Sequence, residues 1–160
     1  MDITGETVAY SAGYPAITAV GEAFAVAWTA DWVGRGDEWD VGFRVLDRDA
    51  SPRVDPAALA ASSQVETSPM VASFGDHALL AWHAYDASSQ GTRLAGQRVN
   101  ADGVLLDTAP LDFGAVAKLS EPILVAGLAG HALLIWEEYV GAPFDAVRLR
   151  LLPLVEATSP

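Results

Sequence analysis

HALLAWHAY at residues 77–85 and HALLIWEEY at residues 131–139 are nearly the same nine residues, placed 54 positions apart. A recurrence at this spacing indicates a chain assembled from copies of one structural unit. Laid over itself at about 54 residues, the chain aligns a tryptophan and a proline in three places. The aligned residues are Trp28, Trp82 and Trp136, with Pro15, Pro69 and Pro122 near the start of each segment.

Each unit predicts β-strands. After the proline come four or five apolar residues, a glycine turn, and an alternating apolar run that ends at the tryptophan, which is typical of a β-hairpin. Proline is expected at the first residue of its strand, where its missing N–H removes no inner ladder bond. A polar loop, a strand through a recurring arginine and a weaker outer strand complete the unit. The aligned arginines are Arg44, Arg98 and Arg150, and the outer strands are expected within 54–61 and 106–113.

The second unit, 68–112, carries the pattern P-x-[VI]-A-x-x-G-x-x-x-L-x-x-W followed by GQRVNADGVLLD. This pattern resembles the repeats of large bacterial β-propeller proteins. The first unit departs from it, with ASPRVD where G-x-L-L-D is expected, and the third departs with AVRLRLLPL. The resemblance implies an all-β fold of four-stranded blades, in a bacterial protein that is secreted or displayed at the cell surface.

The repeats predict one all-β domain over 1–160, with blade-like units at about 1–54, 55–106 and 107–155. Propellers close with four to eight blades, so three units predict a partial propeller. The C-terminal VEATSP echoes VETSP at 65–69, which suggests a piece of a longer array with further blades. Two other arrangements stay open: a homodimer that forms a six-blade ring, and a β-trefoil, which also contains three four-stranded repeats.

Composition excludes several classes of function. The net charge is −12, from 21 acidic and 9 basic residues, and no basic stripe is present, so a nucleic-acid partner is not expected. The absence of cysteine excludes disulfides, zinc–thiolate sites and cysteine nucleophiles. The longest weakly polar stretch, Pro122–Trp136, is shorter than the roughly 20 residues of a membrane span. No signal peptide is expected in this chain, since its start lacks a basic and an apolar region.

The loops after the three repeat tryptophans are the predicted binding surface. They vary in length and sequence, and they concentrate aromatic and carboxylate side chains on what should be a rigid scaffold. An aromatic ring covers the apolar face of a sugar, and neighbouring carboxylates accept hydroxyl or amide hydrogens. The candidate ligand-binding residues are Asp31, Trp32, Asp37, Trp39, His83, Tyr85, Asp86, Glu137, Glu138 and Tyr139.

These residues favour a non-catalytic module that binds or scaffolds carbohydrate or a protein surface. One alternative is a fragment of a carboxylate-using glycoside hydrolase, although no Asp-box turn is present. Another is a purely structural repeat of a larger surface protein. No cofactor or metal is expected; calcium is the alternative, because 36–40 and 47–55 are rich in side-chain oxygens without matching an EF-hand. The recurring tryptophans and arginines are interpreted as structural.

Overall fold

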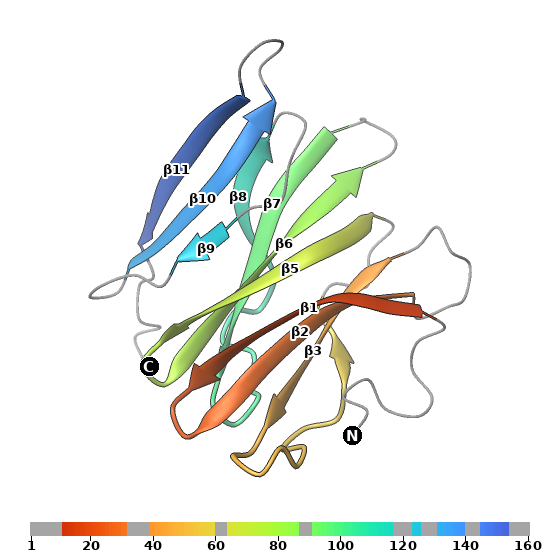
Figure 1. Ribbon diagram of the computed structural model, residues 1–160, viewed down its shortest axis with the longest axis vertical. Helices are drawn as coiled ribbons and strands as arrows, with labels where there is room; N and C mark the ends of the chain where they lie inside the picture. The colour runs from red at the N-terminus through yellow and green to blue at the C-terminus, as the bar shows by residue number, and fades with distance from the viewer. Residues whose placement is uncertain are drawn as a thin grey trace.

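The computed structural model describes residues 11–31, 39–59, 64–86, 91–116, 123–125, 131–139 and 145–153 (Figure 1). The first sheet contains β1 (Ser11–Val20), β2 (Ala23–Asp31), β3 (Asp40–Leu46) and β4 (Ala57–Ala58) in that order. The second contains β5 (Val65–Phe74), β6 (His77–Asp86), β7 (Gly91–Asn100) and β8 (Leu111–Val116). The third contains β9 (Ile123–Val125), β10 (His131–Tyr139) and β11 (Asp145–Pro153).

The all-β prediction is confirmed. All pairings between these strands are antiparallel, and the described ranges contain no helix and no closed barrel. The outermost strands, β4 and β8, start after residues 54 and 106, where the sequence repeats were divided. The first sheet ends at Ala58 and the second at Val116, so both extend past the predicted repeat boundaries.

Pro15 and Pro69 lie inside β1 and β5, so the expectation that each of these two prolines begins its strand was wrong. The ladder between β1 and β2 breaks between Gly13 and Ala16, and the ladder between β5 and β6 breaks between Thr67 and Met70. Pro15 and Pro69 fall within these irregularities, where the missing N–H of proline removes no ladder hydrogen bond. Pro122 lies outside the described residues.

The residue before each of these two prolines has a left-handed backbone. Tyr14 has φ of 50° and Ser68 has φ of 52°, a conformation that side chains other than glycine rarely adopt. The same irregularity therefore occurs at equivalent positions of two repeats. It therefore belongs to the repeated unit.

The sheets pack face to face through their apolar side chains, with β5 beside β1 on one side and β9 on the other (Figure 1). Side chains alternate between the two faces of a strand. Those of β6 therefore pack against a different sheet on each face. One face of β6 and β7 meets the first sheet, and the other meets the third sheet. The first interface contains Ala25, Ala27, Val41, Phe43, Val45, Ala78, Leu80 and Trp82, and the second contains Leu79, Ala81, Leu94, Ala132, Leu134 and Leu152.

The sheet register changes the alignment of the recurring arginines. Trp28 pairs with Gly42, fourteen residues on, whereas Trp82 pairs with Ala95, thirteen residues on. One residue fewer in the second connection moves the following strand by one position relative to its hairpin partner. A shift of one residue also turns each side chain to the opposite face of the sheet.

Gln97 therefore occupies the place of Arg44, and Arg98 does not. Arg44 Nε donates a 2.9 Å hydrogen bond to the Val54 carbonyl, and Gln97 Nε2 donates a 2.8 Å bond to the Asp107 carbonyl, each ten residues onward. Arg98 turns to the other face, where its Nε lies 3.0 Å from Asp107 Oδ1. All three side chains tie a strand to the segment that follows it, which supports the structural interpretation.

The turns that follow β3 and β7 have the same backbone, although their sequences differ. The Asp47 amide donates to the Ser51 carbonyl at 2.8 Å, and the Asn100 amide donates to the Val104 carbonyl at 3.1 Å. The left-handed position is Ala50 in the first turn, with φ of 66°, and glycine at 103 in the second, with φ of 82°. ASPRVD therefore forms the turn that G-x-L-L-D forms in the second repeat.

Substitution at these two positions should have opposite effects. Gly103→Ala should lower the free energy of unfolding by more than about 1 kcal/mol, because of the left-handed backbone and because the new Cβ would lie 2.6 Å from Val54 Cγ1. Ala50→Gly should be neutral or stabilising by up to about 1 kcal/mol, since it relieves the same backbone cost. Urea denaturation measures both, and equal losses in the two variants would contradict this account.

Trp82 is completely buried between the first two sheets. Trp82→Ala should therefore lower the free energy of unfolding by about 3–5 kcal/mol, the range for a large aromatic removed from a core. Tyr85→Ala, on the same strand but exposed, is the matched control and should change stability by less than about 1 kcal/mol. A loss below about 1 kcal/mol for Trp82→Ala would show that the indole contributes little to packing.

Candidate functional site

Strands β2 and β6 end shortly after Trp28 and Trp82, and strands β3 and β5 begin at the same end of the first two sheets. The Thr29 hydroxyl lies 3.5 Å from the Thr67 hydroxyl and accepts a 3.1 Å bond from the Ser68 amide. The Glu66 amide donates a 2.6 Å bond to the Trp39 carbonyl. These contacts define the post-tryptophan end of the molecule, which lies opposite the turns at 47–51 and 100–103.

The candidate residues divide by burial. Asp31 and His83 are buried, at 3% and 7% exposure, Trp39 and Asp86 are half-buried, and Tyr85 is 38% exposed. The structure thus places these five at the post-tryptophan end of the first two sheets. Glu137, Glu138 and Tyr139 are the last three residues of β10. Trp32 and Asp37 lie outside the described residues.

Glu66 is a candidate that the sequence reasoning missed. It is only 2% exposed, and it pairs with Ala84, whose side chain lies in the interface between the first and second sheets. Asp31 lies two residues after Thr29, on the face of β2 that meets the second sheet. Two carboxylates therefore enter the same interface from facing sheets. The signal in the sequence was an acid within an apolar strand, three residues before a repeat proline.

His83 lies on the opposite face of the second sheet from these carboxylates. It follows Trp82 directly, so strand alternation turns it toward the face that carries Leu79 and Ala81. Its Nε2 is buried and has no hydrogen-bond partner among the described residues. Burial lowers the pKa of His83 to about 4, so the imidazole is neutral near pH 7.

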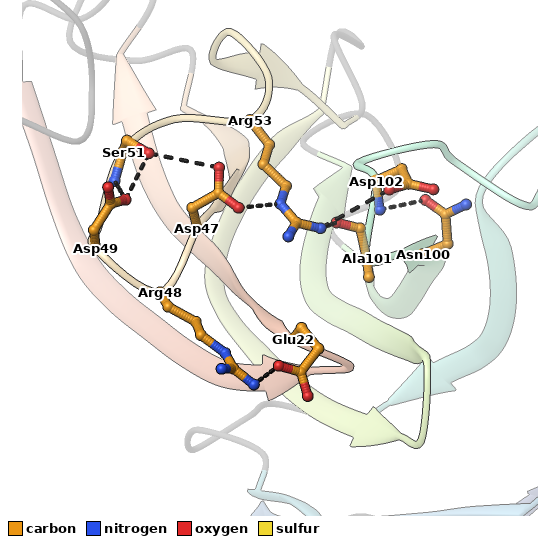
Figure 2. Close-up of polar contacts among 9 residues, drawn as sticks. All are labelled: Glu22, Asp47, Arg48, Asp49, Ser51, Arg53, Asn100, Ala101 and Asp102. Carbon is orange, nitrogen blue, oxygen red and sulfur yellow. Dashed lines mark hydrogen bonds and ion pairs between the residues drawn. The ribbon is translucent and has the colours of Figure 1, made fainter.

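The opposite end of the first sheet has an open depression of about 490 Å³, where charged groups are paired with one another (Figure 2). Arg53 Nε lies 2.6 Å from Asp47 Oδ1, and Arg48 pairs with Glu22. The Arg53 guanidinium also donates a 2.9 Å bond to the Ala101 carbonyl, in the equivalent turn of the second sheet. These contacts therefore connect the first sheet to the second at the turn end.

In the oxygen-rich stretch 47–55, where calcium was the alternative, the carboxylates of Asp47 and Asp49 make hydrogen bonds within the chain. Asp49 accepts bonds from the Ser51 hydroxyl at 2.6 Å and the Ser51 amide at 3.0 Å, and these bonds lower the pKa of the Asp49 carboxyl. Across the part of the chain that the structure describes, no three His, Asp or Glu side chains gather as metal ligands would. Within the same ranges, no helix is long and apolar enough to cross a membrane.

Comparison with known proteins gives structural neighbours only. No protein family model matches this chain, and no curated protein matches it. An endo-arabinase from Bacteroides thetaiotaomicron VPI-5482 is similar over 99% of this chain and 60% of its own, with 11% identity and a TM-score of 0.55. An exo-1,5-alpha-L-arabinanase from a bovine ruminal metagenomic library is similar over 86% and 51%, with 15% identity and a TM-score of 0.54.

An alpha-L-arabinofuranosidase from Lactobacillus brevis is similar over 93% of this chain and 55% of its own, with 13% identity and a TM-score of 0.55. This chain therefore spans between half and three fifths of the length of the structures that it resembles. At such identities the likeness concerns the fold alone, and it supports a propeller-like arrangement of the sheets.

His83 should make the stability of the protein depend on pH. A buried histidine with a pKa near 4 folded and near 6.5 unfolded binds more protons when unfolded, so stability falls as the pH drops from about 6.5 to 4. The loss should be about 3 kcal/mol by pH 4. His83→Gln should remove this part of the pH dependence in urea melts, and the more exposed His77→Gln should retain it. Parallel curves for wild type and His83→Gln would contradict the assignment.

Proposed function

We propose that this chain is a non-catalytic, propeller-type module that binds carbohydrate at its post-tryptophan end. The observation that carries the proposal is the end of β6, where the exposed ring of Tyr85 is followed by the carboxylate residue Asp86. An exposed aromatic face beside a carboxylate suits the apolar face and the hydroxyls of a sugar ring. Trp39, half-buried where β3 begins, supplies a second aromatic residue at the same end.

Two further observations support this proposal. The division of the described strands into three sheets, one for each repeat, favours a partial propeller over a β-trefoil. The similar structures are named as two arabinan-degrading enzymes and an arabinofuranosidase, so linear arabino-oligosaccharides are the natural first ligands to test. A protein surface is the other class of ligand that aromatic and carboxylate side chains would suit.

A carboxylate-using glycoside hydrolase is the second candidate, and the buried Asp31 and Glu66 favour it. Glycoside hydrolysis commonly uses two carboxyl groups, one of them kept protonated by an apolar environment. Both side chains are almost completely buried between two sheets that meet at the post-tryptophan end. A sugar would have to reach that interface for catalysis, whereas binding at Tyr85 needs no such access.

Calorimetric titration with arabino-, xylo- and cello-oligosaccharides tests the binding proposal. Tyr85→Ala should weaken binding at least tenfold, about 1.4 kcal/mol, and Asp86→Asn should weaken it less. Val104→Ala, exposed at the opposite end, is the matched control and should bind as wild type does. Equal affinity in the Tyr85 and Val104 variants would place the ligand elsewhere.

Release of reducing sugar from the same panel separates the two candidates. A module shows binding without turnover. Turnover that Asp31→Asn or Glu66→Gln abolishes, with the thermal melt retained, would support the hydrolase instead. Neither binding nor turnover on the panel would favour a purely structural repeat.

A further inference from the structure

Tyr14 is an exposed aromatic residue at the post-tryptophan end, and it was not among the residues that the sequence predicted to bind a ligand. Its side chain is 59% exposed, against 38% for Tyr85. It follows Gly13, which pairs with Thr29 across the ladder between β1 and β2. Figure 1 shows that β1 and β5 begin on the side of the molecule where β6 ends.

Folding does not account for a tyrosine at this position. Tyr14 has φ of 50°, a left-handed backbone that is an outlier for a bulky residue, and glycine adopts it without steric cost. Ser68 has the same backbone at the equivalent position of the second repeat, with a small side chain. The repeat therefore requires the conformation and does not require the ring. Backbone strain of this kind concentrates at active sites and ligand sites.

The neighbours of Tyr14 along the chain restrict its backbone. Pro15 follows directly, and the proline ring fixes its own φ near about −65°. On the other side, Gly13 is held in the ladder opposite Thr29. A tyrosine on a restricted backbone loses little conformational entropy when a ligand stacks on its ring, which favours binding.

Hydroxyl side chains meet beside Tyr14, where β1 and β5 lie next to each other. Thr29 Oγ1 accepts a 3.1 Å bond from the Ser68 amide and lies 3.5 Å from Thr67 Oγ1. Thr67 and Ser68 are half-buried, and hydroxyl groups both donate to and accept from the hydroxyls of a sugar. This junction therefore combines an exposed ring with polar groups, as the end of β6 does.

We propose that Tyr14 is a second stacking residue of the carbohydrate site, contacted by the same ligand that contacts Tyr85. This inference rests on the proposed function. Tyr85 pairs with Val65, which lies three residues before Ser68 on β5, about 10 Å along a strand. That separation exceeds the length of one sugar ring. The ligand class is therefore a linear oligosaccharide of several rings, since a single ring would contact only one of the two tyrosines.

Calorimetric titration of the full chain with an arabino-disaccharide and an arabino-hexasaccharide tests this inference. Tyr14→Ala should weaken binding of the hexasaccharide about tenfold. It should change binding of the disaccharide, which is too short to contact both rings, by less than about twofold. Ile17→Ala, at a 63% exposed position of the same strand, is the matched control and should bind both sugars as wild type does.

Thermal melts separate a ligand contact from a structural role. Tyr14→Gly should keep or raise the melting temperature, because glycine adopts the left-handed backbone without steric cost. The same variant should weaken binding of the hexasaccharide as Tyr14→Ala does. A structural side chain would show the opposite, with a lower melting temperature and unchanged affinity.

The possible failures are distinguishable. Equal hexasaccharide affinity in the Tyr14 and Ile17 variants, together with weaker binding by Tyr85→Ala, would overturn this inference and leave the proposed function standing. A lower melting temperature of Tyr14→Gly with unchanged affinity would make Tyr14 structural and would also overturn it. If wild type binds neither sugar and none of the other oligosaccharides, the inference and the proposed function are both overturned.

Discussion

The structure depends on one strand, β6, being buried on both faces. Its even-numbered residues from Ala78 to Ala84 pack on the first sheet, and Leu79 and Ala81 pack on the third. Between Ala78 and Trp82 no side chain of this strand reaches solvent, so small and large apolar residues are needed at every one of these positions. ALLAW meets that requirement, and the recurrence of ALL-x-W at 132–136 follows from the same need for packing in the next unit.

The repeat predicted the all-β class, the hairpins and the structural tryptophans because all of these follow from local pattern. Strand starts were less predictable. Proline suggests a boundary, yet Pro15 and Pro69 lie in mid-strand, where an irregular ladder accommodates them. The left-handed backbone at Tyr14 and Ser68 that comes with this irregularity has no glycine to signal it. Only the pairing with the neighbouring strand reveals it.

Register was the other limit. At a 54-residue period Arg44 and Arg98 coincide, but pairing places Gln97 opposite Leu80, as Arg44 lies opposite Val26. A difference of one residue in one connection is invisible in an ungapped alignment and reverses the face of every following side chain. The chemistry was conserved through a different residue, since Gln97 and Arg44 both donate to a carbonyl ten residues onward. Glu66 escaped notice for a related reason, because its burial depends on the sheet that packs against it.

The two ends of the first two sheets differ in how their polar groups affect stability. At the turn end, the ion pair of Arg48 with Glu22 is largely in water and contributes at most about 1 kcal/mol, and the pair of Arg53 with Asp47 is partly exposed. At the post-tryptophan end, Asp31 and Glu66 are withdrawn from water, which costs several kcal/mol per charge before any interaction within the protein offsets it. An imidazole held neutral by burial adds to that cost at low pH. A pKa displaced by burial, as that of His83 is, is more frequent at functional sites than elsewhere, and His83 lies two residues before Tyr85 on β6. The buried carboxylates and the neutral imidazole thus lie at the same end of the molecule as the exposed aromatic ring.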